Sequence, residues 1–464
     1  MDLDIARKLL RKYTEGHSDF ILRANVAERY YRKQNDIIFA KKSETEEDNP
    51  LRQADNRIPG NFHKLLVNQK AAYTFADPPR FDVGEKTGNE TVRKCLGDAW
   101  AKKCKALCVQ AANAGVAWVH YWKDADNRFR YAVLDSRQVV PVWTDSLEKG
   151  LKAALRVYSE VDDETGDSYY VYEIWTETDC QAFRRRIDQE WDCLQYYPRF
   201  AIIDIDSGIA EMTDTYSHDF GEVPFIFFNN NDDMTSDLDD IKHLVDAYDK
   251  VFSGFVNDLE DIQEIIFILT NYGGEADNTA AVLREMKKKV IMVDSAGPDD
   301  KSGVSTLSIE IPVEARKELL TLIRKSIFEQ GMGIDPDPQN FGNSSGVALK
   351  YLYSLLELKT GMMETEFRIS FNRLIRAIMR FHRMPEETTI IQTWRRSSVT
   401  DDAELANICN SSKGIVSDET IVRSHPLVDD PEEEMKRLEE QKKAGEPQWD
   451  RVPIKAVRDG EEEE

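Results

Sequence analysis

The chain has 464 residues, of which 41% are hydrophobic, 31% charged and 10% aromatic. This composition is that of an ordinary globular protein, and the length suits about three average domains. Acidic residues outnumber basic ones by 85 to 61, which gives a formal net charge of −24. Because proteins that grip phosphate groups usually carry the opposite sign, the charge argues against a general nucleic-acid clamp.

The sequence predicts neither a membrane segment nor a metal site. The N-terminus has no basic stretch followed by an apolar one, and the apolar run at 265–269 is far too short to span a bilayer. The six cysteines form no C-x-x-C pair, so reduced thiols are expected. Cys104 and Cys108 stand one helical turn apart near His120, but without a second pair they make an incomplete metal site. We therefore expect buried thiols and no cofactor.

The first part of the chain predicts helices, because apolar residues recur there at spacings of three and four. A polar, acidic stretch at 41–56 predicts an exposed loop, and Pro78 and Pro79 stop the helix that follows it. The predicted helices are residues 3–14, 20–38, 62–75 and 91–114.

From Val116 the pattern changes to short runs of aromatic and β-branched residues separated by turn residues. Such runs are typical of an antiparallel meander or a small sandwich. The predicted strands are residues 116–122, 128–134, 139–143, 151–158, 169–176, 180–186 and 223–228.

Three long helices are predicted in the second half of the chain. From Ser236 to Leu269 apolar residues line one side and acidic residues the other, which predicts a rod roughly 50 Å long at 1.5 Å per residue. A small mixed unit follows, then a helix to Gln330, a loop rich in glycine and proline at 331–343, and a third long helix at 345–383. The remainder predicts acidic helices and a disordered tail at 461–464.

Motifs of common enzymes are scarce in this sequence. No Walker A sequence, G-x-G-x-x-G fingerprint, H-E-x-x-H pair or EF-hand loop occurs. Gly342-Asn343-Ser344-Ser345-Gly346 matches G-x-S-x-G, whose serine in hydrolases follows a buried strand. The prolines before it argue against a strand. A serine hydrolase using Ser344 is therefore the alternative to a loop whose Ser344 or Ser345 caps the next helix.

Basic residues are sparse enough to be informative. They gather on the second long helix and in the unit before it, where they form either a solvated surface or a light contact with a phosphate backbone. The residues are Arg316, Lys317, Arg324 and Lys325 on the helix, and Lys287, Lys288 and Lys289 in the unit before it.

The order of elements and three local strings resemble the portal proteins of tailed double-stranded DNA bacteriophages, of the type found in long-tailed phages of Gram-positive hosts. The strings occur in the right order over almost the whole chain. They run from Asn56 to Lys70 with Asp77-Pro78-Pro79 after it, from Gly342 to Tyr353, and from Gly414 to Thr420 leading into an acidic helix at 429–443.

The resemblance implies an α+β, mainly helical portal fold that forms a ring-shaped oligomer with a central channel. It divides the chain into a wing with N-terminal helices and an antiparallel β region, two stem helices separated by a clip, a tunnel loop, a long wing helix, and a crown with an acidic tail. The corresponding ranges are 1–235, 236–269, 270–311, 312–330, 331–344, 345–383 and 384–464.

The function implied is structural and not enzymatic. The ring, of about twelve subunits, would sit at one capsid vertex of the virion and pass DNA during packaging and ejection, binding the duplex weakly. The implied partners are the terminase large subunit, a head-completion adaptor, tail proteins, and the major capsid and scaffolding proteins, with no membrane; assembly is expected in the host bacterial cytoplasm. The alternative is another oligomeric phage head or tail protein, which would need no tunnel loop.

Candidate channel residues follow from the same resemblance. Gly331, Gly333 and Gly342 are expected to let the loop change conformation, while Pro336 and Pro338 limit its collapse. The loop contains no lysine or arginine, so phosphate contact is expected from Lys350 and the basic residues of the second stem helix. Lys287, Lys288 and Lys289 of the clip are expected to face the packaging motor or the adaptor. The channel candidates are Gly331, Gly333, Asp335, Asp337, Asn340, Gly342, Asn343, Lys350, Arg316, Lys317, Arg324 and Lys325.

Overall fold

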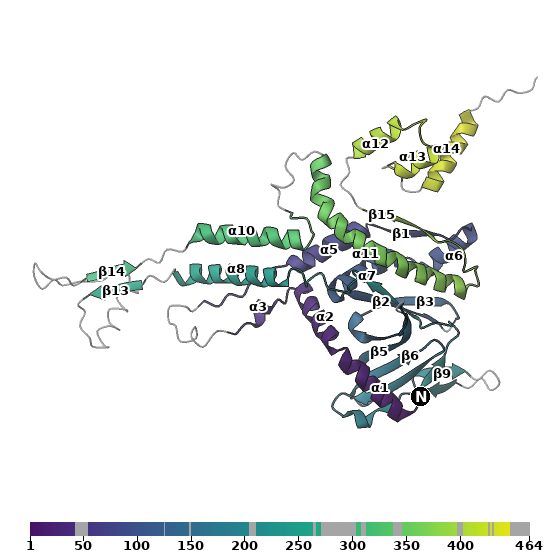
Figure 1. Ribbon diagram of the computed structural model, residues 1–464, viewed down its shortest axis with the longest axis horizontal. Helices are drawn as coiled ribbons and strands as arrows, with labels where there is room; N and C mark the ends of the chain where they lie inside the picture. Colours follow the sequence, from purple (N-terminus) through teal and green to yellow (C-terminus); the bar gives the residue numbers. More distant parts are fainter. Residues whose placement is uncertain are drawn as a thin grey trace, which may run out of the picture. The chain divides into compact units, whose positions relative to one another are not determined.

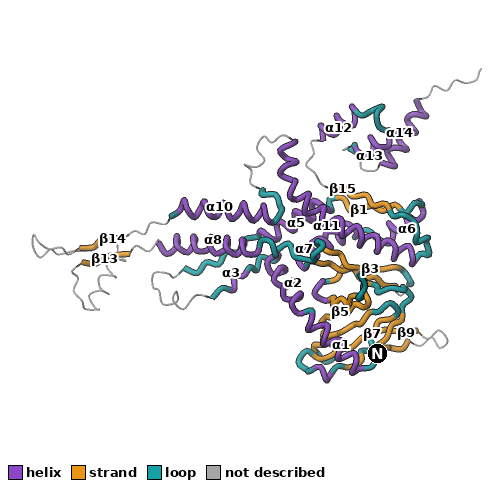
Figure 2. The backbone as a smooth tube through the Cα atoms, viewed as in Figure 1, coloured by secondary structure: helices purple, strands orange, loops and turns teal. Residues whose placement is uncertain are grey.

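A computed structural model describes most of the chain as two compact units. One unit comprises Met1–Gly342 and Tyr351–Ser397, and the other Asn343–Lys350 and Ser398–Glu464. Both helices and strands occur among the described residues (Figure 2). The described residues are 1–41, 54–124, 126–147, 150–203, 210–262, 266–270, 303–307, 312–336, 346–396, 402–425, 427–428 and 431–445.

Two of the four predicted N-terminal helices, 3–14 and 62–75, are confirmed, and the other two are each divided in the structure. The break at Gly16-His17 divides α1 from α2, and α2 ends well before residue 38. The single helix predicted at 91–114 is wrong, because Gly97 adopts a φ of +71° and separates two helices. The helices are α1 (Leu3–Gly16), α2 (Ser18–Tyr31), α3 (Asp36–Phe39), α5 (Phe62–Thr74), α6 (Lys86–Leu96) and α7 (Trp100–Ala114).

The strand predictions are confirmed as two antiparallel sheets. One has the order β12-β2-β3 and the other β11-β7-β6-β5-β4, with β8 beside β7. Leu10 of α1 is fully buried against the larger sheet, where it joins a core with Leu155, Tyr172 and Phe183. The strands are β2 (Val116–Lys123), β3 (Phe129–Leu134), β4 (Val139–Trp143), β5 (Leu151–Val161), β6 (Ser168–Trp175), β7 (Asp179–Arg186), β8 (Gln195–Tyr196), the pair β9 (Phe200–Ile203) and β10 (Ala210–Thr213), β11 (Thr215–Ser217) and β12 (Phe225–Asn229).

The helix predicted at 236–269 is shorter in the structure. Residues 237–241 form turns held to the end of α7, where the amide of Asp237 donates to the carbonyl of Ala112 at 2.8 Å. The helix α8 is Lys242–Ile262, and the apolar run after it forms the strand β13 (Ile266–Thr270), paired with β14 (Gly303–Leu307). A short β-branched and aromatic run fits a helix or a strand equally well by its pattern, and here the pairing with β14 selects the strand.

The predictions for the other two long helices are confirmed. α10 (Val313–Gln330) lies beside α8, and the two run side by side in an antiparallel hairpin (Figure 1). α11 (Gly346–Phe381) extends over 36 residues, and its Phe367, Phe371 and Leu374 are fully buried. They form the main core with residues of α5, α7 and β12.

The short strands β8, β9, β10 and β11 were not predicted, and neither were β1 and β15. β1 (Asp77–Asp82) contains the two prolines that end α5, and it pairs antiparallel with β15 (Ile391–Arg395). The register shifts between Asp77 and Arg80, which is where proline leaves the ladder without a donor. This pair fastens the end of the first unit to its N-terminal half.

The second unit consists of short helices, as the acidic C-terminal sequence predicts. They are α12 (Asp402–Ser411), α13 (Asp418–Ser424) and α14 (Pro431–Gly445). Ser417 caps α13, because its hydroxyl accepts the amide of Thr420 at 3.3 Å. The predicted tail at 461–464 lies outside the described residues. Among the described helices, none combines the length and the apolar composition that crossing a membrane requires.

Candidate functional site

The α8–α10 hairpin is held together by an apolar contact and a charged one. At the end near α5, Ile327 and Phe328 of α10 are buried against Val245 of α8. At the far end, Arg316 donates to Asp258, and its guanidinium lies 5.5 Å from the centre of the Phe255 ring. The charge of Arg316 is therefore matched within the hairpin.

An extended segment, residues 54–60, lies along α8. Its amides at every second position donate to side chains at every fourth position of the helix: Ala54 to Asp261 at 2.9 Å, Asn56 to Asn257 at 2.7 Å, Ile58 to Ser253 at 3.0 Å, and Gly60 to Asp249 at 2.7 Å. Two extended residues advance about 6.6 Å and four helical residues about 6 Å, so the two repeats stay in register. The loop predicted at 41–56 therefore ends as a segment bound to α8, not as an exposed one.

A buried charge cluster lies between α5, α11 and the turns that precede α8. Lys70 and Asp237 are 1% and 4% exposed, and Nζ of Lys70 lies 3.2 Å from Oδ1 of Asp237. Lys359 of α11 approaches the other carboxylate oxygen at 3.1 Å, and Asn230 accepts from Lys70 at 2.7 Å. Burial alone would raise the pKa of Asp237, but the charges of Lys359 and Lys70 outweigh it and hold this pKa well below its usual range.

The loop after α10 begins in close contact with α5. A Cβ on Gly333 would lie 2.0 Å from Cδ2 of Leu66, and one on Gly331 2.6 Å from Cδ1 of the same side chain. The side-chain amide of Gln69 holds both backbone groups of Ile334, donating to its carbonyl at 2.7 Å and accepting from its amide at 3.1 Å. Both glycines thus permit close packing against Leu66, which is a reason for their presence separate from the conformational freedom expected of the loop.

The structure places the other candidate channel residues as follows. Arg324 donates to Asp335 at 2.6 Å, and Lys325 lies 3.7 Å from Glu329, so both are engaged within the chain. Lys317 is exposed. Lys350 belongs to α11, and the structure describes its backbone but not its side chain. Also outside the described residues are Asp337, Asn340, Gly342, Asn343, Ser344, Lys287, Lys288 and Lys289.

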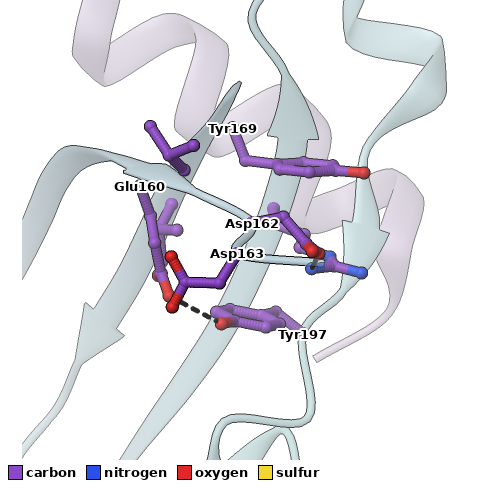
Figure 3. A pocket seen from close by; sticks show the side chains of 8 residues that line it. Glu160, Asp162, Asp163, Tyr169 and Tyr197 are labelled. Atoms are coloured by element: carbon purple, nitrogen blue, oxygen red, sulfur yellow. Dashed lines mark hydrogen bonds and ion pairs between the residues drawn. The ribbon is translucent and has the colours of Figure 1, made fainter. Parts of the chain in front are cut away.

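A small pocket of about 150 Å³ opens near the ends of β5, β6 and β7 in the larger sheet (Figure 3). The guanidinium of Arg184 lies 4.5 Å from the ring centre of Tyr169 and 4.9 Å from that of Tyr197, between the two rings. Asp162 pairs with Arg184 at 3.7 Å, and the Tyr197 hydroxyl donates to Glu160 at 3.2 Å. The guanidinium of Arg184 thus occupies the space between the rings of Tyr169 and Tyr197.

The residues that suggested a metal site in the sequence are buried in the structure. Cys104 is fully buried, and burial raises the pKa of Cys108 to about 12. Nδ1 of His120 lies 2.9 Å from the Pro224 carbonyl, and burial lowers its pKa to about 3. No group of three potential metal ligands comes together among the described residues. Residues 331–336, the described part before the G-x-S-x-G string, contain no strand of the kind a hydrolase nucleophile requires.

Comparison with known proteins identifies the family. Residues 10–448 match the family described as phage portal protein, SPP1 Gp6-like. The chain belongs to this family. The portal protein of Clostridium phage phiCD119 is 41% identical over 434 residues, covering 90% of this chain and 92% of the relative. The portal protein of Bacillus phage SPP1 is 29% identical over 453 residues, covering 93% and 86%. The resemblance to portal proteins of phages with Gram-positive hosts is confirmed.

Solved structures of gene transfer agent particles are also similar to this portal protein. One, titled as the neck of the native GTA particle computed with C12 symmetry, has a TM-score of 0.43 and 12% identity over 79% of this chain and 89% of the other. Another, the virion of the native particle, has a TM-score of 0.43 and 12% identity over 78% and 88%.

The first portal-like string now has a structural meaning. Between Asn56 and Gly60 it binds α8, and at Gln69 and Lys70 it supplies the contacts to the loop and to Asp237. Sequence reasoning missed Gln69, Lys70, Asp237 and Lys359 as a group. The only available signal was that two of them end the string.

Proposed function

We propose that this portal protein assembles into a closed ring of about twelve subunits at one vertex of a phage capsid. Double-stranded DNA would pass through its channel during packaging and ejection. The observation that carries the proposal is the α8–α10 hairpin in a chain of the portal family. A chain that descends a channel wall and returns needs two antiparallel helices joined at one end, which is the arrangement of α8 and α10.

The proposed parts of the subunit follow the order of its elements. Residues 1–235 form the wing, α8 and α10 the stem, and the residues between them, with β13 and β14, the clip. The loop at 331–344 would be the tunnel loop, α11 the wing helix, and residues 384–464 the crown. The long apolar and acidic faces of α8 suit a helix that packs on one side and faces an aqueous channel or a neighbouring subunit on the other.

Weak DNA binding is part of the proposal. Each phosphate that a protein neutralises adds affinity through the release of counterions, and tight binding would stall a moving duplex. Arg316 and Arg324 already pair with Asp258 and Asp335, and the whole chain carries a net charge of −24. Both features suit a conduit.

The ring would serve as a docking site in turn for the terminase large subunit and for a head-completion adaptor with the tail. The capsid and scaffolding proteins would surround the wing, and the mature location would be the virion, after assembly in the host cytoplasm. Lys287, Lys288 and Lys289 of the clip are proposed to face the motor or the adaptor, because a cluster of three lysines in an acidic chain suits an acidic partner surface.

Mass photometry and electron microscopy of the purified full chain test the proposal. We expect a ring of about twelve subunits with an open channel. Since the net charge of −24 makes subunits repel at low ionic strength, the measurement should cover a range of salt concentrations. A protein that stays monomeric at every salt concentration would overturn the ring. A catalytic alternative would require esterase activity that disappears in Ser344→Ala.

A further inference from the structure

The end of α10 has an unusual residue at its turning point. Met332 adopts a φ of +51°, in the left-handed backbone region that residues with a Cβ rarely occupy. Its amide donates to the carbonyl of Glu329 at 3.2 Å, and the amide of Gly333 donates to that of Phe328 at 2.9 Å. This is the pattern that ends helices when glycine is the left-handed residue. Here the glycines stand on either side of that position, so the turn is held by something other than backbone preference.

The contacts around this turn come from α5 and α11. Leu66 of α5 fills the space above Gly331 and Gly333, and Gln69 of α5 binds both backbone groups of Ile334. Ile334 is itself 9% exposed and packs with Tyr73 and Leu356. We refer to residues 331–335 with these contacts as the loop base.

Lys359 of α11 fixes the loop base by charge. Its Nζ donates to the carbonyl of Gly331 at 2.9 Å, directly at the C-terminus of α10, while it also pairs with Asp237. Two buried lysines, Lys70 and Lys359, share this one carboxylate. The partial negative charge at the end of a helix offsets a nearby cation, so the C-terminus of α10 supplies the balance that the second lysine needs.

Arg324 adds a contact from α10 itself. Two of its three guanidinium nitrogens reach the two oxygens of Asp335 at 2.6 and 3.2 Å, which folds the chain back along the helix that it has just left. A strained backbone conformation persists only where the surrounding structure determines it several times over. The loop base, with α5, α10 and α11 all attached to five residues, meets that condition.

We propose that Gln69 and Lys359 are positioning residues that hold the loop base in its left-handed turn and so fix the point from which the tunnel loop enters the channel. The inference rests on the proposed function in that the loop must face a DNA channel. Its new content is that the entry point is set by α5 and α11, and not by the end of α10 alone. Any change in the distance between α5 and α11 would then be transmitted to the loop through these two side chains.

Hydrogen exchange of the full-length protein tests the attachment. Gln69→Leu removes both hydrogen bonds to Ile334 at similar volume, and Lys359→Met removes the charge at Gly331 while Lys70 stays beside Asp237. In Gln69→Leu the Ile334 amide should exchange about tenfold faster, the effect of losing one well-formed hydrogen bond. Asn68→Ala is the matched control, because Asn68 lies on the same helix and bonds Tyr31 instead. Unchanged exchange at residues 331–335 in both variants would overturn the attachment.

A packaging assay with capsids that contain each variant tests the positioning role. We expect Gln69→Leu and Lys359→Met to form rings of normal mass but to lose DNA-filled capsids, and Lys359→Arg to recover them because it keeps the charge. Normal packaging despite faster exchange would reduce Gln69 and Lys359 to structural residues and reject the proposal. If wild-type protein forms no ring, the proposed function fails, while the exchange measurement still decides the attachment by itself.

Discussion

The amide of Gly60 donates to Oδ1 of Asp249 at 2.7 Å, and Oδ2 of the same carboxylate accepts from Asn35 at 2.6 Å. Asp249 is fully buried, and its carboxylate joins two segments that also meet directly, because Asn35 donates to the carbonyl of Gly60 at 3.0 Å. It is the first of four side chains, spaced by four along α8, that bind alternate amides of residues 54–60. Through this series the extended segment packs on one side of α8, while α10 packs on the other side.

Gly60→Ala should destabilise the protein. A Cβ at position 60 would lie 2.9 Å from Oδ1 of Asp249 and 2.9 Å from the Phe62 ring, so either the hydrogen bond or the ring must move. Overpacking of this kind costs about 1–3 kcal/mol. Chemical denaturation monitored by circular dichroism measures the change.

The control for this substitution is Gly254→Ala on α8, where nothing lies within 4 Å of the added Cβ. Alanine is favoured over glycine within a helix, so this variant should be stabilised by about 0.5–1 kcal/mol. Equal effects of the two substitutions would contradict the close contact at Gly60.

His63 should make the protein sensitive to acid. It is 1% exposed, its Nε2 lies 2.9 Å from Oδ1 of Asn113, and burial lowers its pKa to about 4. In the unfolded chain the pKa of histidine is about 6.5. Between about pH 4 and pH 6.5 the unfolded state therefore binds a proton that the folded state does not bind. Its contribution is complete above about pH 6.5 and is lost as the pH falls toward 4.

His63→Gln should therefore flatten the dependence of the unfolding free energy on pH, by as much as about 3 kcal/mol between pH 7 and 4. Glutamine can still donate to Asn113 but does not titrate. The control is His243→Gln, since His243 is exposed on α8. Parallel stability profiles for His63→Gln and wild type would show that another group causes the acid sensitivity.

The helices of the hairpin and the β region followed from local pattern, because their side chains repeat at 3.6 or at two residues. The pattern was insufficient where a distant partner decides the structure. Ile266–Thr270 becomes a strand only because β14 pairs with it, and β1 meets β15 from the other end of the chain. Gln69 and Ile334 are 265 residues apart. No spacing in one segment can reveal such a contact, so the loop base could not be predicted from the sequence.

Met332→Gly should stabilise the end of α10. The left-handed conformation costs a residue with a Cβ about 1–2 kcal/mol, and glycine removes this cost while losing up to about 1 kcal/mol in chain entropy. We expect a small rise in melting temperature. Gly333→Ala is the opposite case, because its Cβ would lie 2.0 Å from Leu66, and it should destabilise by about 2 kcal/mol or more. A destabilised Met332→Gly would mean that the methionine side chain contributes more than its backbone costs.

The basic residues of α10 should differ in their effect on DNA binding. Lys317 is exposed, whereas the guanidinium of Arg324 is bonded to Asp335 at 2.6 Å. Each phosphate contact that is lost lowers the slope of log affinity against log salt by about 0.9. Lys317→Ala should therefore lower this slope in fluorescence anisotropy with a short duplex, whereas Arg324→Ala should leave the slope unchanged and lower protein stability by up to about 1 kcal/mol.

Asp335→Asn tests whether the ion pair with Asp335 is what keeps Arg324 from contacting DNA. If the ion pair is what keeps this guanidinium from phosphates, then removing the carboxylate charge should raise DNA affinity and steepen the salt dependence. The double variant Asp335→Asn with Arg324→Ala should return both to the level of Arg324→Ala alone, because the gain requires the arginine. An affinity gain that persists in the double variant would assign the effect to the lost negative charge at position 335, and Arg324 would then have no part in contacting DNA.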